Sequence, residues 1–325
     1  MAQEANTYDT QDANGLREGL TDTILNIAPT ETPFCSRIAG KGPKPKATKH
    51  EWQTDDLAAA DGENAVEEGD EYSFEDPDPT VRVANHTQII RKGIVISETL
   101  EAVEKAGRKS EMAYQTAKKS KELKRDLEKI ALSNQASSIV GKKRKMAGLA
   151  AWLETNSDRG TGGADGGYSE GTGFVAAATD GTQRAFARSQ LDGVIESCFA
   201  NGADPTVLLV GPKNKRAFSG FAGISELRSN VAGDQKAKKQ ATIVAAADFY
   251  ISDFGTLAVV PDRFQRERDA FVLDPEYVDL CWLRQIKRKK PAKTSDAEKR
   301  VLIGEVTLQV GNEAAHGVVA DLLDS

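Results

Sequence analysis

Residues 110–136 contain neither proline nor glycine, and their few apolar positions recur at helical spacing. The apolar stripe comprises Leu123, Leu127, Ile130 and Ala131. Two opposite-charge pairs are spaced by four residues, Lys118/Glu122 and Lys124/Glu128, and such pairs stabilise a helix. The pattern predicts a helical rod roughly 40 Å long. Because its apolar stripe is narrow, the rod should pack along one face and leave the other wet or shared with a neighbour.

A glycine at position 107 separates this rod from a weaker helical segment at residues 98–106. Inside a helix, glycine costs about 1 kcal/mol relative to alanine. Ser110 and Glu111 can then supply the N-cap and the acidic first turn of the rod. We therefore expect a break at Gly107, with the rod beginning after it.

The sharpest segregation of charge lies in residues 41–97. Eleven acidic residues and no basic residue lie between Asp55 and Pro79. The flanking segments HEWQTD and VRVANHTQIIRKGIVIS have the alternation and β-branching of strands. We predict a projecting β-hairpin, which would be marginally stable alone. Its large apolar residues, Trp52, Val66, Tyr72 and Phe74, favour docking on another copy over a purely solvated acidic loop.

Leu16, Leu20, Ile24 and Ile27 are spaced by three or four residues and predict a short amphipathic helix that ends before Pro29. This helix could pack on its own domain or on a neighbouring subunit, and the sequence leaves both open. Further along, residues 183–265 read as helix, strand, helix, strand, strand. Residues 266–325 are rich in strands and are expected to form the sheet under the rod. Together these patterns predict an α+β fold.

Reactive groups are sparse. His50, His86 and His316 stand apart from one another, and no motif for a zinc site or a nucleophilic elbow is present. The glycine-rich run at residues 158–173 lacks the phosphate-loop signature and is interpreted as a flexible loop. Cys35, Cys198 and Cys281 are expected to be reduced, packed thiols. We therefore predict no catalytic residue, metal or cofactor, with a hydrolase hidden in residues 183–265 as a weak alternative.

The charge pattern favours self-association. At 325 residues the chain carries a net charge of −6, which argues against a protein that mainly coats nucleic acid. An acidic hairpin and several basic clusters on one chain are complementary across copies. The acidic and aromatic tip residues predicted to make contact are Glu67, Glu68, Asp70, Glu71, Tyr72 and Phe74. The candidate basic acceptors are Lys142, Lys143, Arg144, Lys145, Lys287, Arg288, Lys289 and Lys290. Nucleic-acid binding by these clusters is the rival interpretation.

Several sequence blocks, in order, resemble the major capsid proteins of tailed bacteriophages, which have the Hong Kong ninety-seven type capsid fold. They include GLREGLTDTILNIAPTETPF, HEWQTDDLAAA, NHTQIIRKGIVIS, AYQTAKKSKELKRDLEKIAL, GLAAWLETN, YISDFGTLAVVPDRF and VTLQVGNEAAHG. The resemblance implies an N-terminal arm at residues 1–40, with Leu16, Leu20 and Ile24 contacting a neighbouring subunit. It further implies an extended hairpin, the E-loop, at 41–97. The peripheral (P) domain would comprise 98–182, including the spine helix 110–136 and the glycine-rich loop, and 266–325, with the axial (A) domain at 183–265.

The implied function is structural. Copies would form hexamers and pentamers of an icosahedral shell, in the virion, enclosing double-stranded DNA without reading its sequence. The implied partners are copies of the chain itself, a separate scaffolding protein, a portal and a decoration protein. No signal peptide or membrane segment is predicted, and assembly is expected in the bacterial cytoplasm. The alternative is an acidic-loop binding module that recruits a basic partner.

Overall fold

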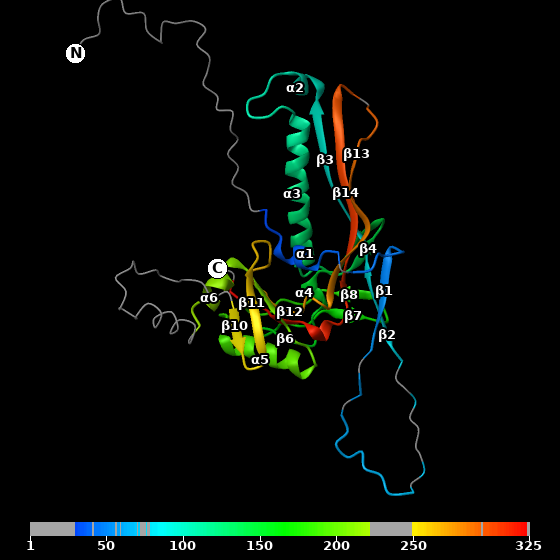
Figure 1. Ribbon diagram of the computed structural model, residues 1–325, viewed down its shortest axis with the longest axis vertical. Helices are drawn as coiled ribbons and strands as arrows, with labels where there is room; N and C mark the ends of the chain where they lie inside the picture. Colours follow the sequence, from blue (N-terminus) through cyan, green and yellow to red (C-terminus); the bar gives the residue numbers. More distant parts are fainter. Residues whose placement is uncertain are drawn as a thin grey trace, which may run out of the picture.

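The computed structural model describes residues 30–40, 42–55, 57–58, 60–69, 71, 76, 79–221, 249–293 and 295–323. The helices are α1 (Pro33–Ile38), α2 (Glu98–Ala102), α3 (Glu111–Ala131), α4 (Leu149–Trp152), α5 (Arg188–Ala200) and α6 (Pro212–Phe218), with a 3₁₀ turn η1 (Glu313–Ala315). Figure 1 shows that the described part of the chain comprises an elongated upper part, a more compact lower part and a descending hairpin.

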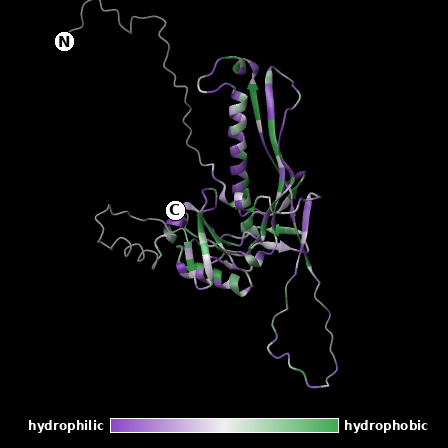
Figure 2. Cartoon of the chain, viewed as in Figure 1, coloured by the Kyte–Doolittle hydropathy of each residue, from purple (hydrophilic) through white to green (hydrophobic). Residues whose placement is uncertain are grey.

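The upper part consists of α3 and a three-stranded antiparallel sheet. The sheet has the order β13 (Val278–Lys289), β14 (Ala297–Val310), β3 (Gln88–Ser97), and α3 runs along it (Figure 1). Leu123 and Leu127 on the helix are buried in one apolar cluster with Ile90 and Leu302 of the sheet. The rest of the helix is largely hydrophilic (Figure 2). The predicted rod, with its narrow apolar face, is therefore confirmed.

The rod ends five residues before the predicted end at 136, because the next side chains bind the backbone of other segments. The Asn134 amide donates to the Ala178 carbonyl at 2.7 Å and accepts from the Ala178 N–H at 2.9 Å. Gln135 donates to the Met146 carbonyl at 2.7 Å. At the other end, the Ser110 hydroxyl accepts from the Ala113 N–H, as predicted for an N-cap.

The break before the rod is also confirmed. Gly107 has φ +70°, a left-handed conformation that suits glycine. The weaker helix is shorter than the predicted 98–106, since α2 stops at Ala102 and Val103 is already extended.

The lower part is built on a six-stranded sheet with the order β10, β11, β9, β12, β15, β6. These strands are β10 (Phe249–Ser252), β11 (Gly255–Pro261), β9 (Val207–Val210), β12 (Ala270–Leu273), β15 (Gly317–Val319) and β6 (Ser157–Asp158). Helix α5 buries Leu191, Val194, Ile195 and Cys198 in a second apolar cluster against this sheet. The predicted succession of helix, strand, helix, strand, strand is found in α5, β9, α6, β10 and β11.

The strands of residues 266–325 divide between the two sheets, which corrects the expectation that all of them lie under the rod. Only β13 and β14 do so. All four residues of β12 are buried, and this strand pairs with β9 on one side and β15 on the other. A strand without a polar face suits the interior of a covered sheet, whereas β13 has exposed residues along its second half.

The glycine-rich run is more ordered than the predicted loop. It contains β7 (Gly167–Ser169), which pairs antiparallel with β8 (Phe174–Ala176) directly after the run. At Gly160 an added Cβ would lie 2.1 Å from the backbone oxygen of Thr182. Glycine is thus required here for close packing of two backbone segments.

The descending hairpin pairs β1 (Lys49–Thr54) with β2 (Val81–His86), in register from Lys49↔His86 to Thr54↔Val81. It forms a two-stranded sheet of its own and points away from α3 (Figure 1). Beyond the strands, Leu57 and Val66 are 99% and 80% exposed. The predicted projecting hairpin is confirmed over β1 and β2, but not to its predicted end at residue 97, because β3 pairs with β14 in the three-stranded sheet. A last short pair, β4 (Ser138–Val140) with β5 (Lys143–Lys145), carries the first basic cluster.

Candidate assembly surfaces

The acidic end of the hairpin is open to solvent where the structure describes it. Glu67, Glu68 and Glu71 are exposed. The other predicted tip contacts, Asp70, Tyr72 and Phe74, and the predicted arm contacts, Leu16, Leu20 and Ile24, lie outside the described residues. Exposed carboxylates on an extended loop give an acidic surface with little apolar cover.

In contrast to its tip, the root of the hairpin is firmly held. The Trp52 ring lies 5.5 Å from the Trp152 ring, which stacks on Tyr168 at 6.1 Å. Buried Asn85 donates to the Leu308 carbonyl at 2.7 Å and accepts from the Ala147 N–H at 2.9 Å. Aromatic pairs and buried amide bonds of this kind fix the direction in which the hairpin leaves the body.

A buried carboxylate ties the hairpin root to the three-stranded sheet. Glu305, on β14, is 3% exposed and accepts from Thr87 Oγ1 at 2.8 Å, Arg144 Nη2 at 2.5 Å and Arg284 Nε at 2.9 Å. Burial alone would raise the pKa of Glu305, but these three donors hold it below its usual value. Arg144, one of the candidate acceptors, is therefore already engaged within its own chain.

The other residues of the first basic cluster lie on the β4–β5 hairpin. Lys142, Lys143 and Lys145 are exposed there. Gly141, with φ +60°, makes the turn between the strands. The sequence treated Arg144 as equivalent to its neighbours, but alternation along β5 turns it toward the body.

The second basic cluster, 287–290, is split between the two faces of β13. Lys287 and Lys289 line a hollow of about 600 Å³ together with Lys44, Trp282 and Arg284. Arg288 instead lines the gap between the sheet and α3, and Lys290 lies 3.5 Å from the Glu298 carboxylate. Register places Lys287 opposite Ile303, and Ile303 opposite Arg91 on β3.

The outer face of the three-stranded sheet thus combines basic side chains with an apolar floor. We define it by Arg91, Lys287, Lys289, Ile303 and Val95. Val95, on the edge strand β3, is a large apolar residue that is 65% exposed. A surface of this kind suits an acidic segment that also carries apolar residues.

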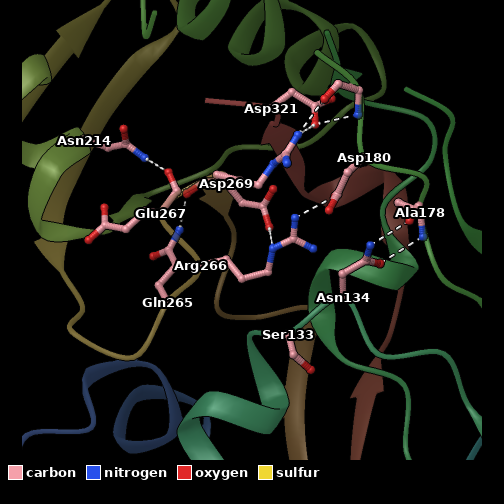
Figure 3. Close-up of polar contacts among 12 residues, drawn as sticks. Ser133, Asn134, Ala178, Asp180, Asn214, Gln265, Arg266, Glu267, Asp269 and Asp321 are labelled. Carbon is pink, nitrogen blue, oxygen red and sulfur yellow. Dashed lines mark hydrogen bonds and ion pairs between the residues drawn. The ribbon is translucent and has the colours of Figure 1, made fainter. Parts of the chain in front are cut away.

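A polar junction between the two parts of the molecule was not anticipated from the sequence. The loop from Asp262 to Asp269 carries Arg266, which reaches Asp180 at 2.6 Å and Asp269 at 3.2 Å (Figure 3). Arg268 pairs with the buried Asp321 at 2.9 Å. The only signal in the sequence was the density of charge between two apolar strands.

We next searched the described residues for metal-ligand clusters and for reactive thiols. Among the described residues, no three histidine, cysteine, aspartate or glutamate side chains gather as a metal site would require. Burial raises the pKa of the Cys198 and Cys281 thiols to about 12, so both are packed and protonated, as predicted. None of the helices in the described ranges is long and apolar enough to cross a bilayer.

The architecture, with its polar rod across a sheet, projecting hairpin and second α/β part, is shared with solved phage capsids. The chain matches the capsid asymmetric unit of cyanophage A-1(L) with a TM-score of 0.66 and 11% identity, over 97% of this chain and 98% of that one. It matches the capsid of a native GTA particle with a TM-score of 0.61 and 13% identity, over 97% and 98%. The fold is therefore that of phage capsids of the Hong Kong ninety-seven type.

Sequence similarity narrows this class. The SU10 major capsid protein family matches residues 3–323, and the chain therefore belongs to that family. It is 29% identical over 343 residues to the major capsid protein of Escherichia phage Phieco32, with 95% of each chain covered. The chain is thus a major capsid protein of a tailed phage and forms the capsid shell of the virion.

Proposed function

We propose that copies of this chain form hexamers and pentamers of an icosahedral shell around double-stranded DNA. In this shell, the acidic hairpin of each copy docks on the basic outer face of a neighbour's three-stranded sheet. The observation that carries the docking proposal is the complementarity of the two surfaces. One has eleven carboxylates and no base between Asp55 and Pro79. The other has Lys287 and Lys289 beside an apolar floor.

This face is a better acceptor than the β4–β5 hairpin. The three exposed lysines there stand on a small two-stranded turn with Ile139 and Val140 as its exposed apolar residues. The sheet face offers a hollow in addition to charge, and shape complementarity matters as much as charge at a specific contact.

A charge-swap experiment tests the contact. The double variants Glu67→Lys/Glu68→Lys and Lys287→Glu/Lys289→Glu should each reduce the yield of shells, because each places like charges together. A mixture of the two double variants should recover part of that yield. Lys142→Glu/Lys143→Glu, which makes the same charge change on the other cluster, should assemble like the unmodified chain.

Shell yield would be measured by sedimentation and negative-stain microscopy, with circular dichroism of the unassembled chains to check folding. If the control pair abolishes assembly while the Lys287/Lys289 pair does not, the acceptor is the β4–β5 hairpin and the docking proposal fails. Capture of a stoichiometric basic host protein by the unassembled hairpin would instead favour the binding-module interpretation.

The remaining parts of the proposal follow from the resemblance to capsid proteins. The N-terminal arm implied for residues 1–40 would act on a neighbouring subunit through the part before α1, because α1 is buried in this chain's own core. The P and A domains would occupy 98–182 with 266–325, and 183–265. A separate scaffolding protein, a portal and a decoration protein would complete a particle assembled in the bacterial cytoplasm. The role is structural rather than catalytic, as membership of a capsid protein family suggests.

A further inference from the structure

Glu128 lies where three segments of the chain meet: the rod α3, the short helix α1 at the base of the N-terminal residues, and the loop that follows β11. Its carboxylate accepts from the Phe34 N–H at 2.7 Å and the Cys35 N–H at 2.8 Å. These two donors are the first-turn amides of α1, which have no partner within that helix. Although it stands on a polar helix, Glu128 is completely buried.

The sequence pattern assigned Glu128 to an ion pair with Lys124, and this is wrong. The tertiary contact with α1 takes the carboxylate away from the rod's surface. Glu122, the other predicted partner, pairs with Lys119 at 2.7 Å rather than with Lys118.

A second carboxyl group, that of Asp262, faces Glu128 from the loop after β11. It is also completely buried, within hydrogen-bonding reach of Glu128. Its Oδ1 accepts from the Phe264 N–H at 2.7 Å, whereas its Oδ2 has no donor among the described groups. Two buried carboxylates in contact cannot both be ionised at low cost, and one proton shared between them would supply the missing donor.

The surroundings offer no compensating cation. No described lysine or arginine forms an ion pair with either carboxyl group. Cys35 faces the pair from α1, and burial raises the pKa of its thiol well above the ordinary value, so the thiol stays neutral. Arg125, on α3, directs its guanidinium over the Phe264 ring, 5.8 Å from the centroid. Burial, followed by the hydrogen bond with Asp262, raises the pKa of Glu128 to about 7.

We propose that Glu128 and Asp262 form a proton-held clasp that fastens α1 and the loop after β11 to the rod, and that loss of the shared proton opens it. The reason is electrostatic: without the proton, two negative charges occupy one buried site, and either α1 or the loop must move to admit water. Opening would free the base of the N-terminal residues. The clasp is internal to one chain and does not depend on how copies contact one another.

The direction of the pH effect follows from the raised pKa. The stabilising contribution is complete below the ordinary glutamate value of 4.5 and is lost as the pH rises through about 7. Between those two values, opening releases one proton and increases the open fraction about tenfold for each pH unit, whereas above about pH 7 both states have lost the proton and the open fraction levels off. Mildly alkaline solution should therefore release α1, and mildly acidic solution should hold it.

Cys35 reports the opening directly, and Cys198 provides a control in the same chain. Both thiols are buried, but Cys198 belongs to the separate apolar cluster around α5. The rates at which iodoacetamide labels the two thiols would be measured in the full unassembled chain by mass spectrometry from pH 5 to pH 8. Taking the ratio of the rates cancels the general effect of pH on thiolate formation.

The ratio of Cys35 to Cys198 labelling should rise about tenfold per pH unit from pH 5 to about pH 7 and level off above that. In Asp262→Asn, whose amide can donate to Glu128 without a titrating proton, the ratio should stay level. Asp253→Asn makes the same change on an exposed turn and should behave like the unmodified chain. A level ratio in the unmodified chain overturns the proposal, and this measurement decides even if Asp262→Asn does not fold. An equal rise in Asp262→Asn also overturns it.

Discussion

The charge cluster at Glu305 allows a quantitative test of how the hairpin root is held. Replacement by alanine would remove the acceptor shared by Thr87, Arg144 and Arg284 and leave two cations around an empty site. Removing one partner of a buried ion pair costs about 3–5 kcal/mol. The Arg144 and Arg284 side chains are 25% and 47% exposed, so both can partly rehydrate. We therefore expect a loss of about 3 kcal/mol in the free energy of unfolding, at the lower end of that range.

The two arginines should rank by their burial. Arg284→Ala leaves Glu305 with Arg144 and Thr87 and removes a half-exposed partner, so the expected cost is about 1 kcal/mol. Arg144→Ala removes the more buried partner and should cost about 2 kcal/mol. Urea unfolding of the unassembled chain, followed by tryptophan fluorescence, measures all three, since Trp282 pairs with Val306 next to the cluster. If Arg284→Ala costs as much as Glu305→Ala, burial does not set the energy of this cluster and the reasoning is refuted.

The same cluster predicts a pH dependence. The donors around Glu305 lower its pKa below the ordinary value. Its stabilising effect is therefore present above about pH 4.5 and is lost as the pH falls through the lowered value. Glu305→Gln keeps the shape but cannot ionise, so its unfolding free energy should fall less steeply under acid conditions. Parallel acid profiles for the two chains would contradict this.

Three further predictions concern stability measured by urea unfolding. Leu123→Ala should cost about 3 kcal/mol, because its buried side chain holds the rod on the sheet, whereas Leu57→Ala, 99% exposed, should change little. Gly193→Ala, where the new Cβ has open space on α5, should raise the free energy of unfolding by about 0.5–1 kcal/mol. Gly148→Ala should instead destabilise the chain strongly, because its Cβ would lie 2.1 Å from a backbone oxygen. Burial lowers the pKa of His316 to about 4. The stability that the neutral imidazole confers above pH 6.5 should therefore be lost as the pH falls toward 4. In His316→Asn, the free energy of unfolding should depend less on pH over this range.

Much of the fold follows from local pattern. The spacing of Leu123 and Leu127 predicted one apolar face, and burial confirms it. The glycine at position 107 predicted the break before the rod, and its positive φ confirms that the chain turns there. The β1–β2 hairpin followed from alternation on either side of an acidic run. In each case, residues that decide the structure lie within about one or two turns of helix or one strand of each other.

The candidate assembly surfaces could be predicted less completely from the sequence. The basic run 287–290 was visible, and alternation along a strand divides it between two faces. Which of its side chains face the hollow depends on irregularities in the strand register between Trp282 and Lys287. No periodicity in a single strand reveals such a bulge, because it arises in pairing with β14.

The sequence by itself therefore determined the rod, its narrow apolar face, the hairpin and the class of the protein. Only the tertiary structure decided the partners of the buried charges. Glu128 meets amides 94 and 93 residues away, and Glu305 meets Arg144 across 161 residues. Both acids stand in segments whose local pattern also suits an exposed charge. Each carboxylate holds separate segments together only because it is buried, and its burial depends on what the rest of the chain packs over it.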